Sequence, residues 1–84
     1  MNIIIYSQPA CTFCDQAKAL LKSKKISFTE INLNVGQKQE EGKHYIPVKE
    51  FHDKFPKVRA LPFILEGRTH IGGFTELQRF LRYD

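Results

Sequence analysis

The two cysteines of the chain stand close together in the stretch ACTFC, directly after the apolar run NIIIY at residues 2–6. A short, continuous run of β-branched and apolar residues is typical of a strand buried on both faces of a sheet. Pro9 interrupts this strand, and residues 12–24 have the composition of a helix. The cysteine pair therefore lies at a junction between a buried strand and a helix, with Cys11 at the start of that helix.

The segments that follow complete a strand–helix–strand unit. Residues 26–33, ISFTEINL, are rich in strand formers and come after a short basic turn. Two strands separated by one helix favour parallel pairing within a sheet. Residues 34–44 are polar and contain two glycines, so they predict a loop. We expect a second helix from Pro47, which suits a first helical turn, to just before Pro56.

The last third of the chain predicts a hairpin and a third helix. Residues 63–65 and 69–71 are expected as short strands joined by a turn at residues 66–68. Thr75, with Gln78 three residues further on, fits a capping box in which Thr75 is the N-cap of the last helix. The predicted order is β-α-β-α-β-β-α, an α/β fold with a four-stranded mixed sheet flanked by three helices. Residues 1–84 are expected to form one domain.

The spacing of the cysteines predicts redox chemistry rather than structural cross-linking. A bridge between Cys11 and Cys14 would close almost no loop, so it would add little stability. A C-x-x-C motif at a strand-to-helix junction is typical of thioredoxin-type exchange between thiols and disulfides. We expect the amides of Phe13 and Cys14, in the first helical turn, to stabilise a thiolate at Cys11. Cys14 is expected to be buried and to resolve a mixed disulfide formed at Cys11.

Metal binding is the competing explanation for a cysteine pair. It would need two more ligands, and the chain offers His44, His52 and His70. Their separations from the cysteines and from one another fit no usual zinc spacing. We therefore expect no metal site.

Charge and hydropathy limit the partners. The formal net charge is +4, and the one basic cluster, Lys22, Lys24 and Lys25, falls at the end of a predicted helix. Cations there interact favourably with the helix dipole, so we interpret the cluster as a solvated helix end rather than a nucleic-acid site. A mildly positive surface would also attract an acidic protein or an anionic peptide such as glutathione. No signal peptide or membrane span is visible, which predicts a cytoplasmic protein without a membrane partner.

Three segments occur in the order and at the separations found in glutaredoxins: IYSQPACTFCDQAKALL, LPFIL and HIGGFTEL. The chain resembles that family over residues 3–81, and most of all its small bacteriophage and bacterial members. The resemblance implies a thioredoxin-like fold and an enzyme that reduces protein disulfides or glutathione mixed disulfides through a dithiol. It also implies glutathione as reductant, no permanently bound cofactor, and client proteins that include ribonucleotide reductase. A monomer is expected.

The resemblance also implies site residues. Pro62 matches the cis-proline of the family, which faces the redox pair and leaves the backbone of Leu61 free to pair with glutathione or a client cysteine. Phe13 matches an aromatic position beside the active cysteine, and Tyr6 matches a tyrosine that ends the first strand. The γ-glutamyl end of glutathione is expected at a further segment that contains Gly72, Gly73, Phe74 and Thr75.

The chain departs from the common pattern at several positions. Thr12 stands where many members have proline, and its hydroxyl is a possible partner for the Cys11 sulfur. Gln8 replaces a lysine that would favour the thiolate and the glycyl carboxylate of glutathione, and Arg59 or Lys57 could substitute for it. An aspartate that would hold the amino group of glutathione is missing after Gly73.

Three other functions remain open from the sequence. The dithiol could be recharged by thioredoxin reductase instead of glutathione, because the two routes differ by only about 40–70 mV in potential. Thr12 makes a [2Fe–2S] carrier conceivable, since some family members without proline in the motif hold a cluster between two chains. A redox-inert binding module is the third alternative, and it predicts that Cys11 is dispensable.

Overall fold

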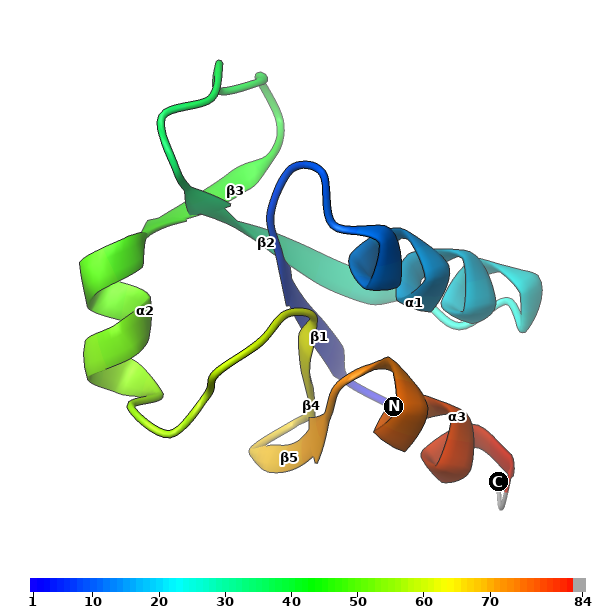
Figure 1. Cartoon of the computed structure of the whole chain (residues 1–84). Helices are drawn as coiled ribbons and strands as arrows, with labels where there is room; N and C mark the ends of the chain where they lie inside the picture. The colour runs from blue at the N-terminus through cyan, green and yellow to red at the C-terminus, as the bar shows by residue number, and fades with distance from the viewer. Residues whose placement is uncertain (83–84) are drawn as a thin grey trace.

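The computed structural model describes residues 1–82. It is a layered α/β structure in which helices cover both faces of one sheet (Figure 1). The elements follow one another as β1 (Ile3–Ser7), α1 (Thr12–Ser23), β2 (Phe28–Asn34), β3 (His44–Pro47), α2 (Val48–Lys54), β4 (Phe63–Glu66), β5 (Thr69–Gly72) and α3 (Phe74–Arg82).

The sheet is mixed, as predicted, and β1 lies at its centre. The strand order is β3-β2-β1-β4-β5. β1 pairs in parallel with β2 and antiparallel with β4, so that Ile5 lies opposite Glu30 on one side and Ile64 on the other. β2 and β3 are parallel, whereas β4 and β5 are antiparallel. The carboxyl end of β1 thus leads into α1 from the middle of the sheet.

The sheet has five strands, so the prediction of four was wrong. The additional strand is β3, where the sequence predicted the end of a loop and the start of a helix. Tyr45 and Ile46 are good strand formers, and Ile46 is buried against the sheet. Pro47 is the last residue of this edge strand and the N-cap of α2, rather than a residue inside the helix. An edge strand tolerates proline because no further strand needs its missing N–H group.

Two hydrophobic cores lie on the two faces of the sheet, and alternation along the strands divides the side chains between them. Ile3 and Ile5 of β1 belong to the core under α1 and α3, while Tyr6 belongs to the core under α2. In Figure 1, α1 and α3 lie on one side of the strands and α2 on the other. The first core contains Ile3, Ile5, Ala17, Leu21, Ile64, Leu77 and Leu81; the second contains Tyr6, Leu33, Ile46, Phe51, Phe63 and Leu65.

Helix α3 begins one residue before the predicted N-cap. Leu77 N–H donates to the carbonyl of Gly73 at 2.9 Å, so Gly73 takes the N-cap position. Glu76 Oε1 accepts from the Gly73 N–H at 2.8 Å, which is the return bond of a capping box. The predicted capping box of Thr75 and Gln78 is therefore wrong. None of the helices within residues 1–82 is long and apolar enough to cross a bilayer.

Candidate active site

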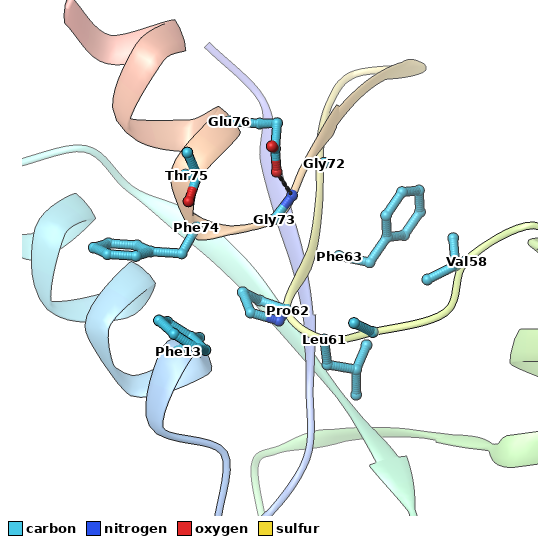
Figure 2. A pocket seen from close by; sticks show the side chains of 11 residues that line it. Phe13, Val58, Leu61, Pro62, Phe63, Gly72, Gly73, Phe74, Thr75 and Glu76 are labelled. Carbon is cyan, nitrogen blue, oxygen red and sulfur yellow. Dashed lines mark hydrogen bonds between the residues drawn. The ribbon is translucent and has the colours of Figure 1, made fainter.

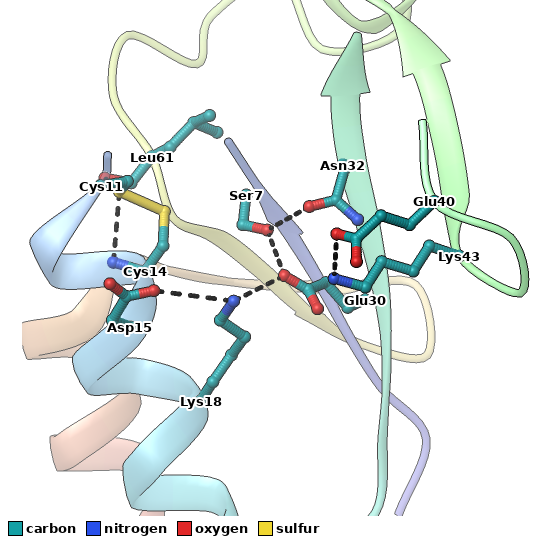
Figure 3. A network of polar contacts seen from close by, with 10 residues as sticks. All are labelled: Ser7, Cys11, Cys14, Asp15, Lys18, Glu30, Asn32, Glu40, Lys43 and Leu61. Carbon is teal, nitrogen blue, oxygen red and sulfur yellow. Dashed lines mark hydrogen bonds and ion pairs between the residues drawn. A yellow bond between two sulfur atoms is a disulfide. The ribbon is translucent and has the colours of Figure 1, made fainter. Parts of the chain in front are cut away.

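The redox pair is built into the first turn of α1. Cys11 is the N-cap residue, and its sulfur accepts a hydrogen bond from the Cys14 N–H at 3.2 Å. The sulfur thereby takes the place of the side-chain oxygen that usually caps a helix. Cys11 and Cys14 are joined by a disulfide (Figure 3). The predicted contact with the Cys14 amide is confirmed, whereas Phe13 N–H is not among the sulfur's hydrogen-bond partners.

The two cysteines differ in their access to solvent. Cys11 is half-buried, while Cys14 is fully buried, as predicted from its position on the inward face of the helix. An incoming disulfide can therefore reach only the sulfur of Cys11. Ala10, directly before it, has a left-handed backbone (φ 56°) that turns the chain from β1 into α1. The bend places Cys11 beyond the carboxyl end of the central strand β1, at the start of α1.

The loop before β4 supplies the second side of the site. The peptide bond between Leu61 and Pro62 is cis, as the sequence comparison with glutaredoxins implied. The carbonyl oxygen of Leu61 lies 3.7 Å from the Cys11 sulfur. Pro62 is buried and Leu61 is half-buried. The backbone of residue 61 therefore lies directly beside the exposed sulfur, where a bound chain could pair with it.

A groove of about 350 Å³ opens beside this loop (Figure 2). Phe13 of α1 and Phe74 of α3 form one wall, with their ring centroids 6.2 Å apart. The side chain of Phe13 is 58% exposed although it is apolar. The groove joins most of the expected substrate-binding residues, because it is lined by Phe13, Leu61, Pro62, Gly72, Gly73, Phe74 and Thr75 together with Val58, Ala60, Phe63 and Glu76.

The N-terminus of α3 gives this groove hydrogen-bond donors. The amides of the first helical turn, Phe74 and Thr75 included, have no intrahelical acceptors. Such amides favour a bound carboxylate. Glu76 lies at the same end of the helix, where its carboxylate accepts a hydrogen bond from the Gly73 amide. The sequence reasoning missed Glu76, although the Gly-x-x-Glu spacing is the signal that could have found it.

A second groove, of about 230 Å³, lies on the other side of Leu61. It contains Gln8 and Arg59, two of the expected contacts, above apolar side chains that include Val35 and Val48. Arg59 thus lines the same groove as Gln8. This is the position that a substitute for the missing lysine needs. Lys57 lines neither groove. Val58, Ala60 and Leu61 line both grooves, so this segment forms the ridge between them.

Thr12 is exposed at the first position of α1 and lines neither groove. Among the side-chain hydrogen bonds of the described residues, none joins its hydroxyl to the Cys11 sulfur. Tyr6 is also outside the grooves. Its ring packs against Phe51 and Phe63 in the second core, and burial, with the nearby Glu50 charge, raises the pKa of its hydroxyl. Tyr6 therefore belongs to the packing of the sheet.

A polar network lies beside the disulfide on the β2 side (Figure 3). Lys18 donates to Glu30 Oε2 at 2.7 Å, and the buried hydroxyl of Ser7 donates to the same oxygen at 2.6 Å. Burial alone would raise the pKa of the Glu30 carboxyl, but these two hydrogen bonds and the Lys18 charge hold that pKa below its ordinary value. Lys18 is thus bound to Glu30 rather than to a cysteine.

Within residues 1–82, no group of three or more histidine, cysteine, aspartate or glutamate side chains is arranged to hold a metal ion. What the site does contain is an accessible sulfur at a helix N-terminus, a buried sulfur bonded to it, and free backbone groups along an open groove. A reduced thiol pair in this arrangement can exchange with a disulfide that binds along the groove.

Comparisons with known proteins agree with this chemistry. A sequence model of one protein family, described as Glutaredoxin, matches residues 3–62. Glutaredoxin 3 of Escherichia coli K12 is 42% identical over 76 residues, which make up 90% of this chain and 81% of that protein. Glutaredoxin 1 of Rickettsia prowazekii is 33% identical over 77 residues, or 90% of this chain and 73% of that protein. The fold resembles the crystal structure of glutaredoxin 1 from Francisella tularensis complexed with cacodylate, with a TM-score of 0.73 at 24% identity over 98% of this chain and 93% of that chain.

Proposed function

The chain belongs to the glutaredoxin family of thiol–disulfide oxidoreductases, and we propose that it uses glutathione to reduce protein disulfides and glutathione mixed disulfides. The observation that supports this most strongly is the unequal access to the two sulfurs. Cys11 is half-buried beside the groove, whereas Cys14 is 0% exposed behind it. This arrangement suits one cysteine that attacks and one that resolves.

In the first half of the proposed cycle, the thiolate of Cys11 attacks one sulfur of the substrate disulfide. A bond forms between Cys11 Sγ and that sulfur, and the other substrate sulfur leaves as a thiolate that takes up a proton. The sulfur of Cys14, after losing its proton, then attacks Cys11 Sγ. The second substrate sulfur leaves as a thiolate that takes up a proton. The two electrons that reduce the substrate come from the thiols of Cys11 and Cys14, which are oxidised to a disulfide.

In the second half, two molecules of glutathione return these electrons. The first glutathione thiolate attacks Cys11 Sγ, and Cys14 leaves as a thiol after protonation. The second attacks the sulfur of the bound glutathione, which releases glutathione disulfide and the Cys11 thiolate. In this proposal the same mixed disulfide forms directly when the substrate is a glutathionylated protein, so Cys14 is not needed for that reaction.

The groove offers complementary groups for glutathione. We assign the backbone of Leu61 to the cysteinyl part of the peptide, since this backbone lies beside the Cys11 sulfur. The amides of Phe74 and Thr75 suit the γ-glutamyl carboxylate, and Gln8 and Arg59 suit the glycyl carboxylate on the other side of the ridge. Phe13 would flank the bound peptide.

The wider setting is also part of the proposal. The chain would act as a monomer with one domain, in a compartment such as the cytoplasm where thiols are kept reduced. Disulfide-containing proteins, with ribonucleotide reductase as one possible client, would be its partners.

A coupled assay tests the source of electrons. Wild-type protein is given a disulfide substrate with NADPH, and either glutathione plus glutathione reductase or thioredoxin reductase alone. We expect NADPH oxidation only in the first mixture. Activity in the second mixture and none in the first would replace glutathione by thioredoxin reductase as the electron donor.

A further inference from the structure

Positive charge gathers at the end of the molecule remote from the disulfide. Lys22, Lys24 and Lys25 lie at the C-terminal end of α1, and Arg79 and Arg82 lie in the last turn of α3. All five side chains belong to exposed residues. The formal net charge of the whole chain is +4, so the five positive charges at this end outnumber the net positive charge of the protein.

A groove of about 390 Å³ runs between the two helices at this end. Lys24, Arg79 and Arg82 line it, and half-buried Leu20 contributes apolar surface beside Leu81, which belongs to the first core. Within residues 1–82, none of its lining residues is acidic. We call this surface, with Lys22 and Lys25 beside it, the basic groove. The basic groove combines apolar surface with cations, whereas a helix end that only contacts solvent requires no apolar surface.

The helix dipole explains only part of this arrangement. Cations within the last turn of a helix are stabilised by its carbonyl groups. Lys24 is the C-cap of α1, but Lys25 lies beyond the helix. The ion pairs found among residues 1–82 involve Lys18, Lys43 and Lys49, so none satisfies a cation of the basic groove.

The basic groove extends away from the candidate active site, and Thr75 is the one described residue that lines both grooves. Helix α1 has 12 residues, so its C-terminal end lies about 18 Å from Cys11 at its N-terminus. Helices α1 and α3 run in the same general direction in Figure 1, which puts both of their C-terminal ends on the side away from the redox pair. A partner bound to the basic groove would therefore leave Cys11 accessible.

We propose that the basic groove docks an acidic amphipathic segment of a partner protein. Glutamates or aspartates on one face of such a segment would meet Lys24, Arg79 and Arg82, and its apolar side chains would cover the exposed part of Leu20. A nucleic acid is the less suitable occupant, because none of the groove-lining residues within 1–82 has an aromatic side chain for a base to stack on.

The test is a binding measurement that does not depend on catalysis. The probe is a fluorescein-labelled synthetic peptide in which leucines recur at helical spacing among glutamates, and its fluorescence anisotropy is followed during titration with the full chain. The variant Lys24→Gln/Arg79→Gln/Arg82→Gln removes three charges from the basic groove. The matched control, Lys38→Gln/Lys49→Gln/Lys54→Gln, removes three charges outside it.

We expect the groove variant to weaken binding by about tenfold or more, and the control variant by less than about twofold. Raising NaCl from about 50 to about 300 mM should weaken wild-type binding. Circular dichroism establishes that both variants are folded, and equal rates with a small-molecule disulfide establish that catalysis is intact. The binding measurement does not use the redox activity, so it would give the same result if the proposed redox function were wrong.

Three outcomes would overturn the proposal. Equal weakening by the two variants would show attraction to the net charge alone. Polyglutamate that binds as tightly as the amphipathic peptide would show that the apolar surface takes no part. Tighter binding of a single-stranded oligonucleotide than of the peptide would make this surface a nucleic-acid site.

Discussion

The backbone amide of Cys14 donates to the sulfur of Cys11 at 3.2 Å, so the buried cysteine stabilises the sulfur that it also bonds covalently. A hydrogen bond of this kind strengthens when the acceptor carries a negative charge. Reduction would therefore leave the Cys11 thiolate in a prepared position, with the resolving sulfur next to it on the same turn of helix.

The two cysteines should respond differently to substitution. Cys11→Ser removes the accessible thiol of the redox pair, so reduction of every disulfide substrate should fall to the background rate. Cys14→Ser should retain most of the activity towards a glutathione mixed disulfide, because glutathione can resolve that intermediate, and should lose the dithiol reaction with protein disulfides. Assays of both variants on both substrates provide the check; substantial activity in Cys11→Ser would exclude the proposed cycle.

Gly72→Ala should damage both the stability of α3 and the binding of glutathione. Gly72 has φ 119°, which a residue with a Cβ rarely adopts, and an added Cβ would lie 2.9 Å from Glu76 Cγ. We expect the free energy of unfolding to fall by about 1–3 kcal/mol, from backbone strain together with loss of the Glu76 cap. Urea unfolding and the KM for glutathione measure the two effects.

Gly67→Ala is the matched control for this substitution. Gly67 also has a positive φ, of 60°, but an added Cβ there would meet nothing within 4 Å. Backbone strain alone should cost about 1 kcal/mol of stability, and the KM for glutathione should stay unchanged. An equal rise in KM for both variants would mean that the effect of Gly72→Ala is not local to the groove.

Glu30→Gln should change how stability depends on pH. The pKa of Glu30 is held below its ordinary value in the folded chain, so the ionised carboxylate stabilises the fold above the unfolded-state pKa. That contribution is lost as the pH falls through the folded pKa. We expect the wild type to lose stability below about pH 4.5 more steeply than Glu30→Gln does.

At neutral pH, Glu30→Gln should lower the free energy of unfolding by about 1 kcal/mol, because the contact with Lys18 is only partly buried. Thermal unfolding of both proteins across the acidic range is the measurement. Parallel pH profiles for the wild type and the variant would contradict the assignment of this carboxylate as the titrating group.

Phe13→Ala should impair substrate binding without unfolding the protein. Phe13 is 58% exposed, and its ring forms a wall of the groove with Phe74, so removal of the ring takes away contact surface for the peptide but little core packing. The KM for a glutathione mixed disulfide should rise about three- to tenfold, while kcat and stability stay near the wild-type values. Phe13→Tyr, which keeps the ring, should restore the wild-type KM; failure to do so would argue against a role for the ring.

The parts of the fold that the sequence predicted well are those with strong local patterns. The run at residues 2–6 is apolar on both faces, which predicts a buried strand. Cys14, Ala17 and Leu21 share one side of a helix, so burial of these side chains is compatible with few other secondary structures. The place of Cys11 at the helix start followed from the same pattern. The two grooves of the candidate site, by contrast, needed tertiary structure, since residues such as Phe13 and Phe74 are far apart in the chain.

The two errors have physical causes. Strand β3 is only four residues long and ends in a proline, which also suits a helix start, so local preference alone could not separate the alternatives. At α3, a glycine occupies the N-cap and Thr75 is a better local candidate for that position. The bond from Glu76 back to Gly73 decides the true start, and it depends on a side chain inside the helix.

The short strands β3 and β5 have a consequence at the borders of the sheet. Each is four residues long and has no neighbour on its outer side within the described chain. Pro47 removes one donor from β3, and a register shift between Ile64 and Leu65 interrupts the ladder beside β5. Neither border therefore offers another molecule a long, regular template for strand addition, which protects a small protein of this kind from sheet-to-sheet aggregation.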